Sequence, residues 1–328
     1  MLRILQAFGF LLGIVAAMAG PAAAQDNRQD NRQDNRPVRL VVSFPPGGGV
    51  DAVARLFADK MSAQLGQTVI VENRGGASGI IAGKQVASAE PDGTSVLIAS
   101  NSMVVAQVMS PNVGLDIARD LKPLASAAPQ AIIITSQPDL PASTLQELIA
   151  LAKTRRLNYG SPGAGSVPHL LGVYLLGSLA GVTLDHIPFP GAAQALTALL
   201  GKQVDLAMVT LSPAVTLVAD GKMKGIVVTT PERSAALPQV PTAAESGYPG
   251  FSVSIWTGFF VPARTPKPIA DKLEGVILKV ANEPEIKAKL SQLGFEPTNI
   301  PGERFQRELV AEIKRWDEVV EKAGIKQK

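Results

Sequence analysis

Apolar and polar residues alternate along the chain in a unit that occurs six times after Pro37. Each unit has a short run rich in β-formers, a loop of small residues, and a stretch whose apolar residues recur every three or four positions. The first unit leads from "VRLVVSF" through "PPGGG" into a predicted helix with Val50, Val53, Phe57 and Met61 on one face.

The other five units have the same order of strand, loop and helix. Their predicted strands are residues 68–73, 95–100, 157–161, 184–189 and 205–210. Strands that alternate with helices in this way form parallel sheets whose faces are covered by the helices. The pattern therefore predicts an α/β protein.

Two apolar runs depart from this unit, "AIIITS" near residue 132 and "IWTGFFVPA" near residue 258, because no glycine loop of the same kind follows them. We interpret them as two crossings between two lobes. The predicted lobe 1 consists of residues 37–135 and 256–328, and the predicted lobe 2 of residues 136–255. The amphipathic stretches at the end of the chain are expected to pack back on lobe 1.

The beginning of the chain has the pattern of an export signal. Arg3 precedes an apolar stretch, and "AAA" precedes Gln25 as a small-residue cleavage site. A membrane anchor is the alternative, but the apolar stretch is short for a bilayer span and lacks a basic stop. We predict a signal peptide over residues 1–24, cleaved near Ala24–Gln25. The polar "QDNR" repeats of residues 25–36 predict a disordered leader.

Composition excludes several classes of function. The net charge is +3, and the basic residues are scattered, which argues against nucleic acid as a partner. The absence of cysteine excludes disulfides, thiolate metal sites and a lipid-carrying cysteine. With only two histidines, we expect no metal and no cofactor. An exported chain without a lipid anchor points to the periplasm, where we expect a monomer.

The loops of the units are suited to an anion. In open α/β sheets, ligands bind at the carboxyl ends of the strands, where loops lead into helices. Such loops offer unpaired backbone N–H groups at the positive end of a helix dipole. Because glycine and serine let an anion approach closely, the sequence predicts an anion-binding cleft that needs no arginine.

Three enzymatic interpretations fit less well. Gly47, Gly49 and Ala52, with Glu72 further on, match a loose dinucleotide fingerprint, but two prolines precede the glycines. A phosphate-binding P-loop around "GGASGIIAGKQ" fails at two of its required positions, and no serine lies in a G-x-S-x-G motif. We therefore predict that the chain is not an enzyme and keep a dinucleotide-dependent enzyme as the weaker alternative.

Seven segments carry a family resemblance in their order and spacing. They are "FPPGGGVDAVAR", "VIVENRGGASG", "EPDGTSVLIAS", "NYGSPGAGSVPHL", "GKQVDLAMV", "LPQVPTAAESGYPGF" and "WTGFFVPARTP". Together they resemble the Bug-type extracytoplasmic solute receptors, which are the substrate-binding proteins of tripartite tricarboxylate transporters. The resemblance covers residues 37–328. The chain departs from the family pattern at Gly75, commonly proline, and at Phe189 and Pro190, often tyrosine and lysine.

The resemblance implies a two-lobed periplasmic-binding-protein fold of type II, in which two crossing strands form the hinge and each lobe is a mostly parallel sheet flanked by helices. It also implies that the lobes close on a small carboxylate and deliver it to the permease subunits of the transporter. A sensor that docks on a receptor kinase with the same ligand is the alternative function.

The candidate ligand site combines loops of both lobes. From lobe 1 it takes Phe44, Gly47, Gly48, Ala77, Ser78, Ser100 and Asn101. From lobe 2 it takes Ser161, Gly165, Ser166, His169, Phe189, Gly191 and Ala192.

Overall fold

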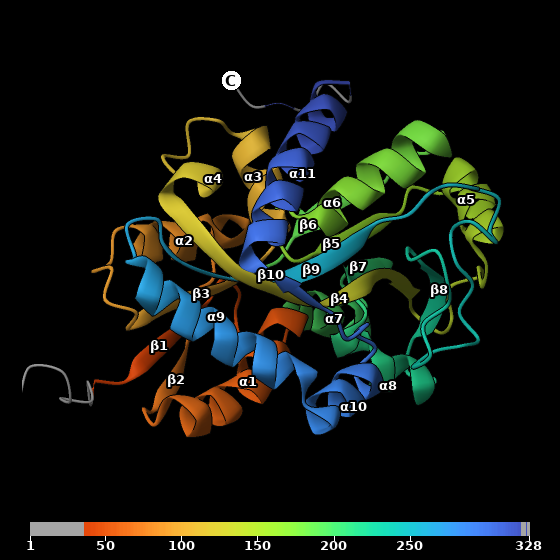
Figure 1. Cartoon of the computed structure of the whole chain (residues 1–328). Helices are drawn as coiled ribbons and strands as arrows, with labels where there is room; N and C mark the ends of the chain where they lie inside the picture. Colours follow the sequence, from red (N-terminus) through yellow and green to blue (C-terminus); the bar gives the residue numbers. More distant parts are fainter. Residues whose placement is uncertain (1–35, 323–325, 327–328) are drawn as a thin grey trace, which may run out of the picture. The chain divides into compact units, whose positions relative to one another are not determined.

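Two sets of parallel strands lie at the two ends of one mixed sheet (Figure 1). The computed structural model describes residues 36–322 and residue 326. The predicted signal peptide, and the predicted leader up to residue 35, lie outside the described residues. Because the two sets carry helices on both sides, the chain has the predicted two-lobed α/β fold. The residue limits of the lobes stay a prediction.

The strand bounds follow the predicted apolar runs closely. In the first set, β1 (Val38–Val42) lies between β2 (Val69–Asn73) and β3 (Ser95–Ser100). In the second set, β5 (Asn158–Ser161) lies between β6 (Asp185–Pro188) and β7 (Leu206–Thr210). The inner strand of the first set, β1, is largely apolar because helices cover both of its faces.

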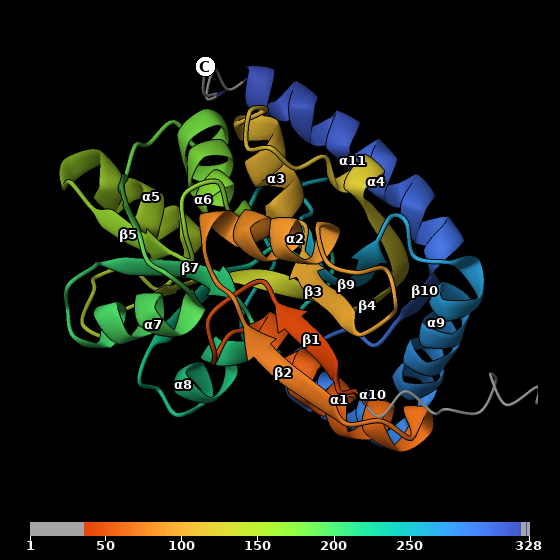
Figure 2. The same cartoon turned by 90° about the vertical axis from the view of Figure 1, so that its left-hand side faces the viewer.

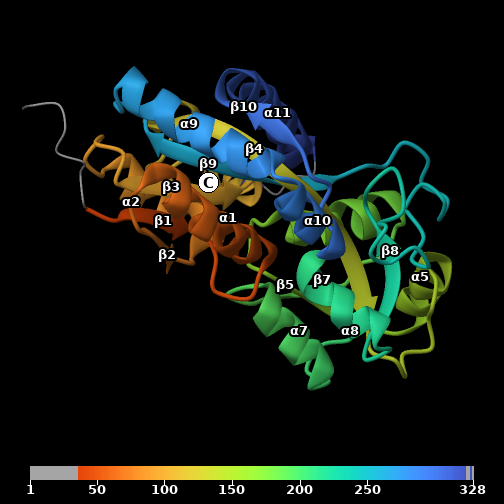
Figure 3. The ribbon, with the colours of Figure 1, turned by 60° about the horizontal axis from the view of Figure 1, so that its bottom comes forward.

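One long strand, β4 (Leu121–Ser136), belongs to both sets (Figure 3). It pairs antiparallel with β9 (Ser254–Pro262) as far as Ala131, and with β7 from Ile132 onward. Only the second half of β4 was predicted from the sequence. The first half contains Pro123 and Pro129, which remove ladder hydrogen bonds and lie where the register with β9 shifts.

Two further strands were not predicted, β8 (Lys224–Val228) and β10 (Asn299–Pro301), and both pair antiparallel with β4. They are short, and no small-residue loop leads from them into a helix. With β4 and β9 they make the sheet mixed, while the parallel strands keep the strand–loop–helix order that the sequence shows.

The helices of the first part of the chain connect these strands (Figure 2). They are α1 (Gly49–Leu65), α2 (Ile80–Ala87), α3 (Ser102–Met109), α4 (Ile117–Asp120), α5 (Leu145–Thr154), α6 (Val167–Leu171), α7 (Ala192–Leu200) and α8 (Val215–Ala219). The short helical turns are η2 (Ala77–Gly79) and η4 (Ser212–Ala214), and the π-helical segment η3 (Gly172–Leu179) continues α6.

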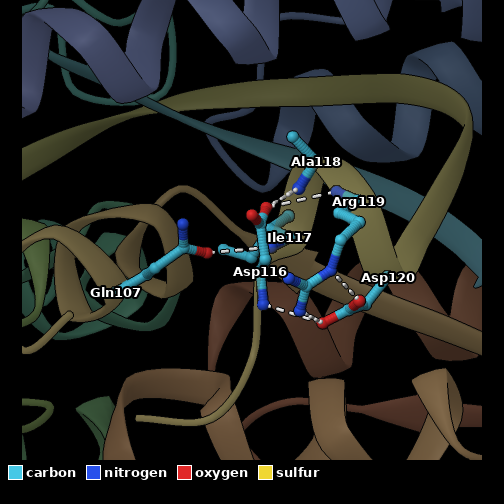
Figure 4. Close-up of polar contacts among 6 residues, drawn as sticks. All are labelled: Gln107, Asp116, Ile117, Ala118, Arg119 and Asp120. Atoms are coloured by element: carbon cyan, nitrogen blue, oxygen red, sulfur yellow. Dashed lines mark hydrogen bonds and ion pairs between the residues drawn. The ribbon is translucent and has the colours of Figure 1, made fainter. Parts of the chain in front are cut away.

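The start of β4 is held by a polar cluster at α4 (Figure 4). The carboxylate of Asp116 accepts hydrogen bonds from the backbone N–H groups of Ala118 and Arg119, and so caps α4. The Gln107 side chain accepts the N–H of Ile117, and the guanidinium of Arg119 donates twice to Asp120. The chain thus turns sharply into Leu121, the first residue of β4.

The last three helices pack back on the first set of strands, as predicted. They are α9 (Lys267–Asn282), α10 (Pro284–Gln292) and α11 (Gly302–Lys322). On α11 the apolar face buries Phe305, Leu309 and Trp316, and Phe305 packs against Phe260 of β9 at a ring distance of 5.4 Å. Among the described residues, no helix has the length and apolar character needed to cross a membrane.

Two glycine substitutions test the packing of β9 against α11 at Gly258. A Cβ at Gly258 would come within 2.6 Å of the Phe305 ring, whereas a Cβ at Gly275, on the exposed side of α9, would meet nothing within 4 Å. We expect Gly258→Ala to lower the free energy of unfolding by about 1–3 kcal/mol through overpacking. Gly275→Ala should raise it by about 0.5–1 kcal/mol through helix propensity.

The measurement is urea unfolding of both variants and the parent, with the slopes compared to check two-state behaviour. Equal stabilities for the two variants would show that β9 does not pack against α11 as described.

Candidate functional site

A small cavity lies between the two sets of parallel strands. Its volume is about 30 Å³, and both sets line it. Four of the predicted site residues line this cavity, namely Phe44, Gly48, Ser100 and Ala192. The other lining residues, which the sequence analysis did not select, are Pro45, Gly49, Val50, Ser102, Pro162, Pro168, Thr210 and Ile255.

Two helices begin at this cavity, one from each set. The N-cap residue of α1 is Gly48, and that of α7 is Gly191; neither helix start has a side-chain cap. Because the first N–H groups of a helix have no partner within the helix, both starts present free donors and the positive end of a dipole. The arrangement is suited to an anion that enters between them.

Asp51 shapes the glycine loop that precedes α1. Its buried carboxylate accepts hydrogen bonds from the N–H of Gly47, from Arg55 and from Asn73 on β2. Burial alone would raise the pKa of Asp51, but these hydrogen bonds outweigh it and lower the pKa. The carboxylate therefore stays ionised and tied into the loop, and it does not line the cavity.

The loop of η2 reaches from the first set to the second. Ala77 and Ser78 both have left-handed backbones, with φ of 46° and 51°, which is unfavourable for residues with a side chain. In this conformation the hydroxyl of Ser78 donates to the carbonyl of Ala164, 2.8 Å away. A second contact joins the N–H of Val167 to the hydroxyl of Ser102 at 3.2 Å. These bonds hold the loops of the two sets together beside the cavity.

One polar side chain at the cavity and one behind its wall have groups without a side-chain hydrogen-bond partner. The hydroxyl of Thr210, at the carboxyl end of β7, makes no side-chain hydrogen bond to another described residue and lines the cavity. Gln130 is fully buried, and its amide nitrogen has no partner although its oxygen accepts the N–H of Ser212. A Cβ at position 49 would lie only 2.1 Å from that nitrogen, so only glycine fits at this position.

The sequence contains a pattern that points to Thr210 but none that points to Gln130. The strand run "DLAMVT" ends at Thr210, so the rule that ligands bind at the carboxyl ends of strands could have selected it. Gln130 lies in the proline-containing half of β4, which carries no strand pattern.

The other predicted residues of the second set form the support of the cavity wall. Ser166 caps α6: its hydroxyl accepts the N–H of His169 and donates to the carbonyl of Gly163. The ring of His169 accepts the N–H of Gly165. Ser161 bonds to the other histidine, His186, at 2.7 Å.

The remaining predicted residues lie at the edges. Phe189 packs over Gly160, and Gly191 lies against Pro45. Gly47, with φ of 86°, approaches Ala193 of α7. The side chain of Asn101 points away from the cavity, toward Ser254 and Glu312.

The two histidines stack beneath the second-set wall, with ring centroids 4.1 Å apart. Burial lowers the pKa of His169. Burial, and then the charge of His169, lowers the pKa of His186 to about 4. Both rings are therefore neutral at pH 7. Within the described part of the chain, no three His, Asp or Glu side chains are grouped so that they could hold a metal ion.

The histidine pair predicts a pH dependence of stability. Histidine in the unfolded chain binds its proton near pH 6.5, but both native rings bind it only at lower pH. Between those values the unfolded chain binds more protons, so the free energy of unfolding should fall as the pH drops from about 7 to about 5. Urea unfolding at both pH values measures this. His186→Gln should reduce the difference, and an unchanged difference in that variant would contradict the assignment.

The chain was compared with known proteins. The model of the family "Tripartite tricarboxylate transporter family receptor" matches residues 53–325. A UPF0065 protein of Bordetella pertussis is 36% identical over 292 residues, which cover 88% of this chain and 90% of the relative.

Solved structures are similar over nearly the same length. The periplasmic binding protein BugD has a TM-score of 0.85 and 36% identity, over 89% of this chain and 99% of its own. MatC of Rhodopseudomonas palustris, with bound malate, has a TM-score of 0.80 and 32% identity, over 87% and 99%. A second R. palustris protein, with adipate, has a TM-score of 0.82 and 30% identity, over 89% and 98%. The chain therefore belongs to the receptor family of the tripartite tricarboxylate transporters, whose members are periplasmic solute-binding proteins.

Proposed function

We propose that the chain captures a small carboxylate between its lobes in the periplasm and delivers it to the membrane permease subunits of a tripartite transporter. The observation that carries the proposal is the pair of uncapped helix starts, α1 and α7, at one cavity. The similarity to structures that hold malate and adipate supports a carboxylate as the ligand.

The ligand would be held by neutral donors. Among the described residues, no Lys, Arg or His lines the cavity, so backbone N–H groups and the hydroxyl of Thr210 are the groups at hand. The unpaired amide nitrogen of Gln130 lies behind the wall, against Gly49. A hydrogen bond to a charged group contributes roughly 1.5–3 kcal/mol, and a helix start up to about 2 kcal/mol. Several such contacts support micromolar binding after the cost of ordering the loops.

The size of the cavity indicates how the ligand enters. A volume of about 30 Å³ holds little more than one water molecule, and a dicarboxylate is larger. The loops must therefore separate to admit the ligand, and the hydrogen bonds of Ser78 and Ser102 across the cavity must break when they do. A receptor that closes around its ligand behaves in this way.

The lining also argues against catalysis. Among the described residues at this cavity, none has an ionisable side chain that could act as acid, base or charged nucleophile. Glu72, the acidic residue of the dinucleotide fingerprint, pairs with Arg74 at 2.6 Å. Capture and release of an unchanged solute fits this site better than a reaction.

Binding is tested first with a thermal-shift screen of small mono-, di- and tricarboxylates on the purified protein. Calorimetric titration with the best ligand then compares variants. Gly48→Val adds a branched side chain at the cavity where nothing lies within 4 Å, so the fold should persist. Thr210→Val removes one hydroxyl without changing the shape. We expect Gly48→Val to weaken binding at least about tenfold, and Thr210→Val by a similar factor.

Arg55→Ala is the control, because this guanidinium is 57% exposed and already paired with Asp51. It should weaken binding less than either cavity variant. Loss of binding in Arg55→Ala with normal binding in both cavity variants would mean that an ion pair holds the anion.

A further inference from the structure

The β5–α6 loop, residues 162–166, forms part of the wall of the ligand cavity. Pro162 of this loop and Pro168 of α6 both line the cavity. The loop also carries a contact between the two sets of strands, because the carbonyl of Ala164 accepts the hydroxyl of Ser78 at 2.8 Å. A displacement of this loop would therefore change the shape of the ligand site.

The loop is fastened from behind by His169 of α6, which does not itself line the cavity. The backbone N–H of Gly165 donates to Nδ1 of the His169 ring at 3.2 Å. Gly165 has a left-handed backbone, with φ of 74°, a conformation that glycine adopts without strain. The ring therefore acts on the ligand site through the loop and not by contact with the ligand.

This hydrogen bond fixes the protonation state of the His169 ring. A backbone N–H can only donate, so Nδ1 must accept and carries no proton. A neutral ring with its proton on Nε2 makes the bond, whereas an imidazolium has an N–H at both nitrogens and cannot accept. Protonation of His169 therefore replaces the hydrogen bond with two N–H groups that point at each other.

A second ring lies against the first. His186 of β6 stacks on His169 with ring centroids 4.1 Å apart, and its Nε2 lies 2.7 Å from the hydroxyl of Ser161, the last residue of β5. Two imidazolium ions at this distance would repel each other. Because burial lowers the pKa of both rings, the pair is neutral at pH 7, and the bond to Gly165 is made there.

The other groups around the pair do not compensate a positive charge. Tyr159 of β5 donates its hydroxyl to the backbone carbonyl of His169, and burial raises the pKa of this phenol, so it stays uncharged. Asp185 precedes His186 on β6, so its side chain lies on the other face of the strand, where it pairs with Arg156 at 2.6 Å. The β5–α6 loop, α3 and β7 contain no ionisable side chain.

We propose that His169 is a positioning residue of the ligand site, which holds the β5–α6 loop when its ring is neutral and releases the loop, weakening carboxylate binding, when the ring is protonated. The inference rests on the proposed carboxylate binding. Since the native ring takes up its proton only below the usual histidine value of about 6.5, the affinity should be full near pH 7 and fall as the pH drops below that value.

Two substitutions separate the acceptor atom from the proton. His169→Asn places an amide oxygen close to the position of Nδ1, and this oxygen can accept the N–H of Gly165 but does not titrate. His169→Leu has an apolar side chain of similar size and no acceptor, so the N–H of Gly165 loses its partner.

The measurement is calorimetric titration with malate and with adipate at pH 7 and pH 5, on variants whose fold is checked by circular dichroism at both pH values. We expect the Kd of the parent to rise about threefold or more from pH 7 to pH 5. His169→Leu should bind about fivefold more weakly than the parent at pH 7. His169→Asn should recover most of that loss and should lose little more at pH 5. Because the ligand titrates alike in every sample, the ratio of the parent's Kd to that of His169→Asn isolates the effect of the histidine.

His186→Gln is the matched control, because it removes the other histidine and leaves Nδ1 of His169 in place. This variant should keep a pH-dependent Kd. The inference is wrong if His169→Asn keeps the pH dependence of the parent, or if His169→Leu binds as tightly as the parent at pH 7.

Failure of the proposed function is recognised separately. If the parent binds neither malate nor adipate at pH 7, the proposed carboxylate binding fails for these probes, and nuclear magnetic resonance of the ligand-free protein tests the inference. The amide signal of Gly165 should shift between pH 7 and pH 5 in the parent and stay constant in His169→Asn. A constant signal in the parent would overturn the inference.

Discussion

The continuity of β4 through both sets of strands is the constraint on which the rest of the structure depends. The strand changes partner between Ala131 and Ile132, and β9 begins beside this point. Because β4 is hydrogen-bonded to β9 in one part and to β7 and β8 in the other, one continuous strand joins the two sets. The cavity lies beside this point, because it is lined by Thr210, which pairs with Ile132, and by Ile255, which pairs with Gln130.

An anion site without a cation is physically consistent with this arrangement. The starts of α1 and α7 offer backbone donors to one cavity, so an anion there needs no charged side chain. Asp51 does not oppose an anion, because its charge is taken up by Arg55 and by the N–H of Gly47 on the side away from the cavity. Its role is to shape the loop that presents the start of α1.

A strand could be predicted from the sequence where its own residues carry a clear strand pattern. The six strands of the parallel sets were found because each is a short run rich in β-formers that leads into an amphipathic stretch. The first half of β4 was not, because Pro123 and Pro129 interrupt it and its stability comes from the paired β9. In the same way Ser102 and Ile255 were not selected for the site, because only the packing of α3 and β9 decides which of their residues meet the cavity.

The sequence by itself determined the α/β order, the two crossings and the loops of small residues where backbone donors are free. These follow from periodicity and backbone sterics, which act over a few residues. Only the tertiary structure decided that Gly48 and Ala192 share one cavity, that Asn101 turns to Glu312 on the far side, and that His169 and His186 support the wall by stacking. These relations join residues distant in the chain, and the packing of the lobes about β4 establishes them.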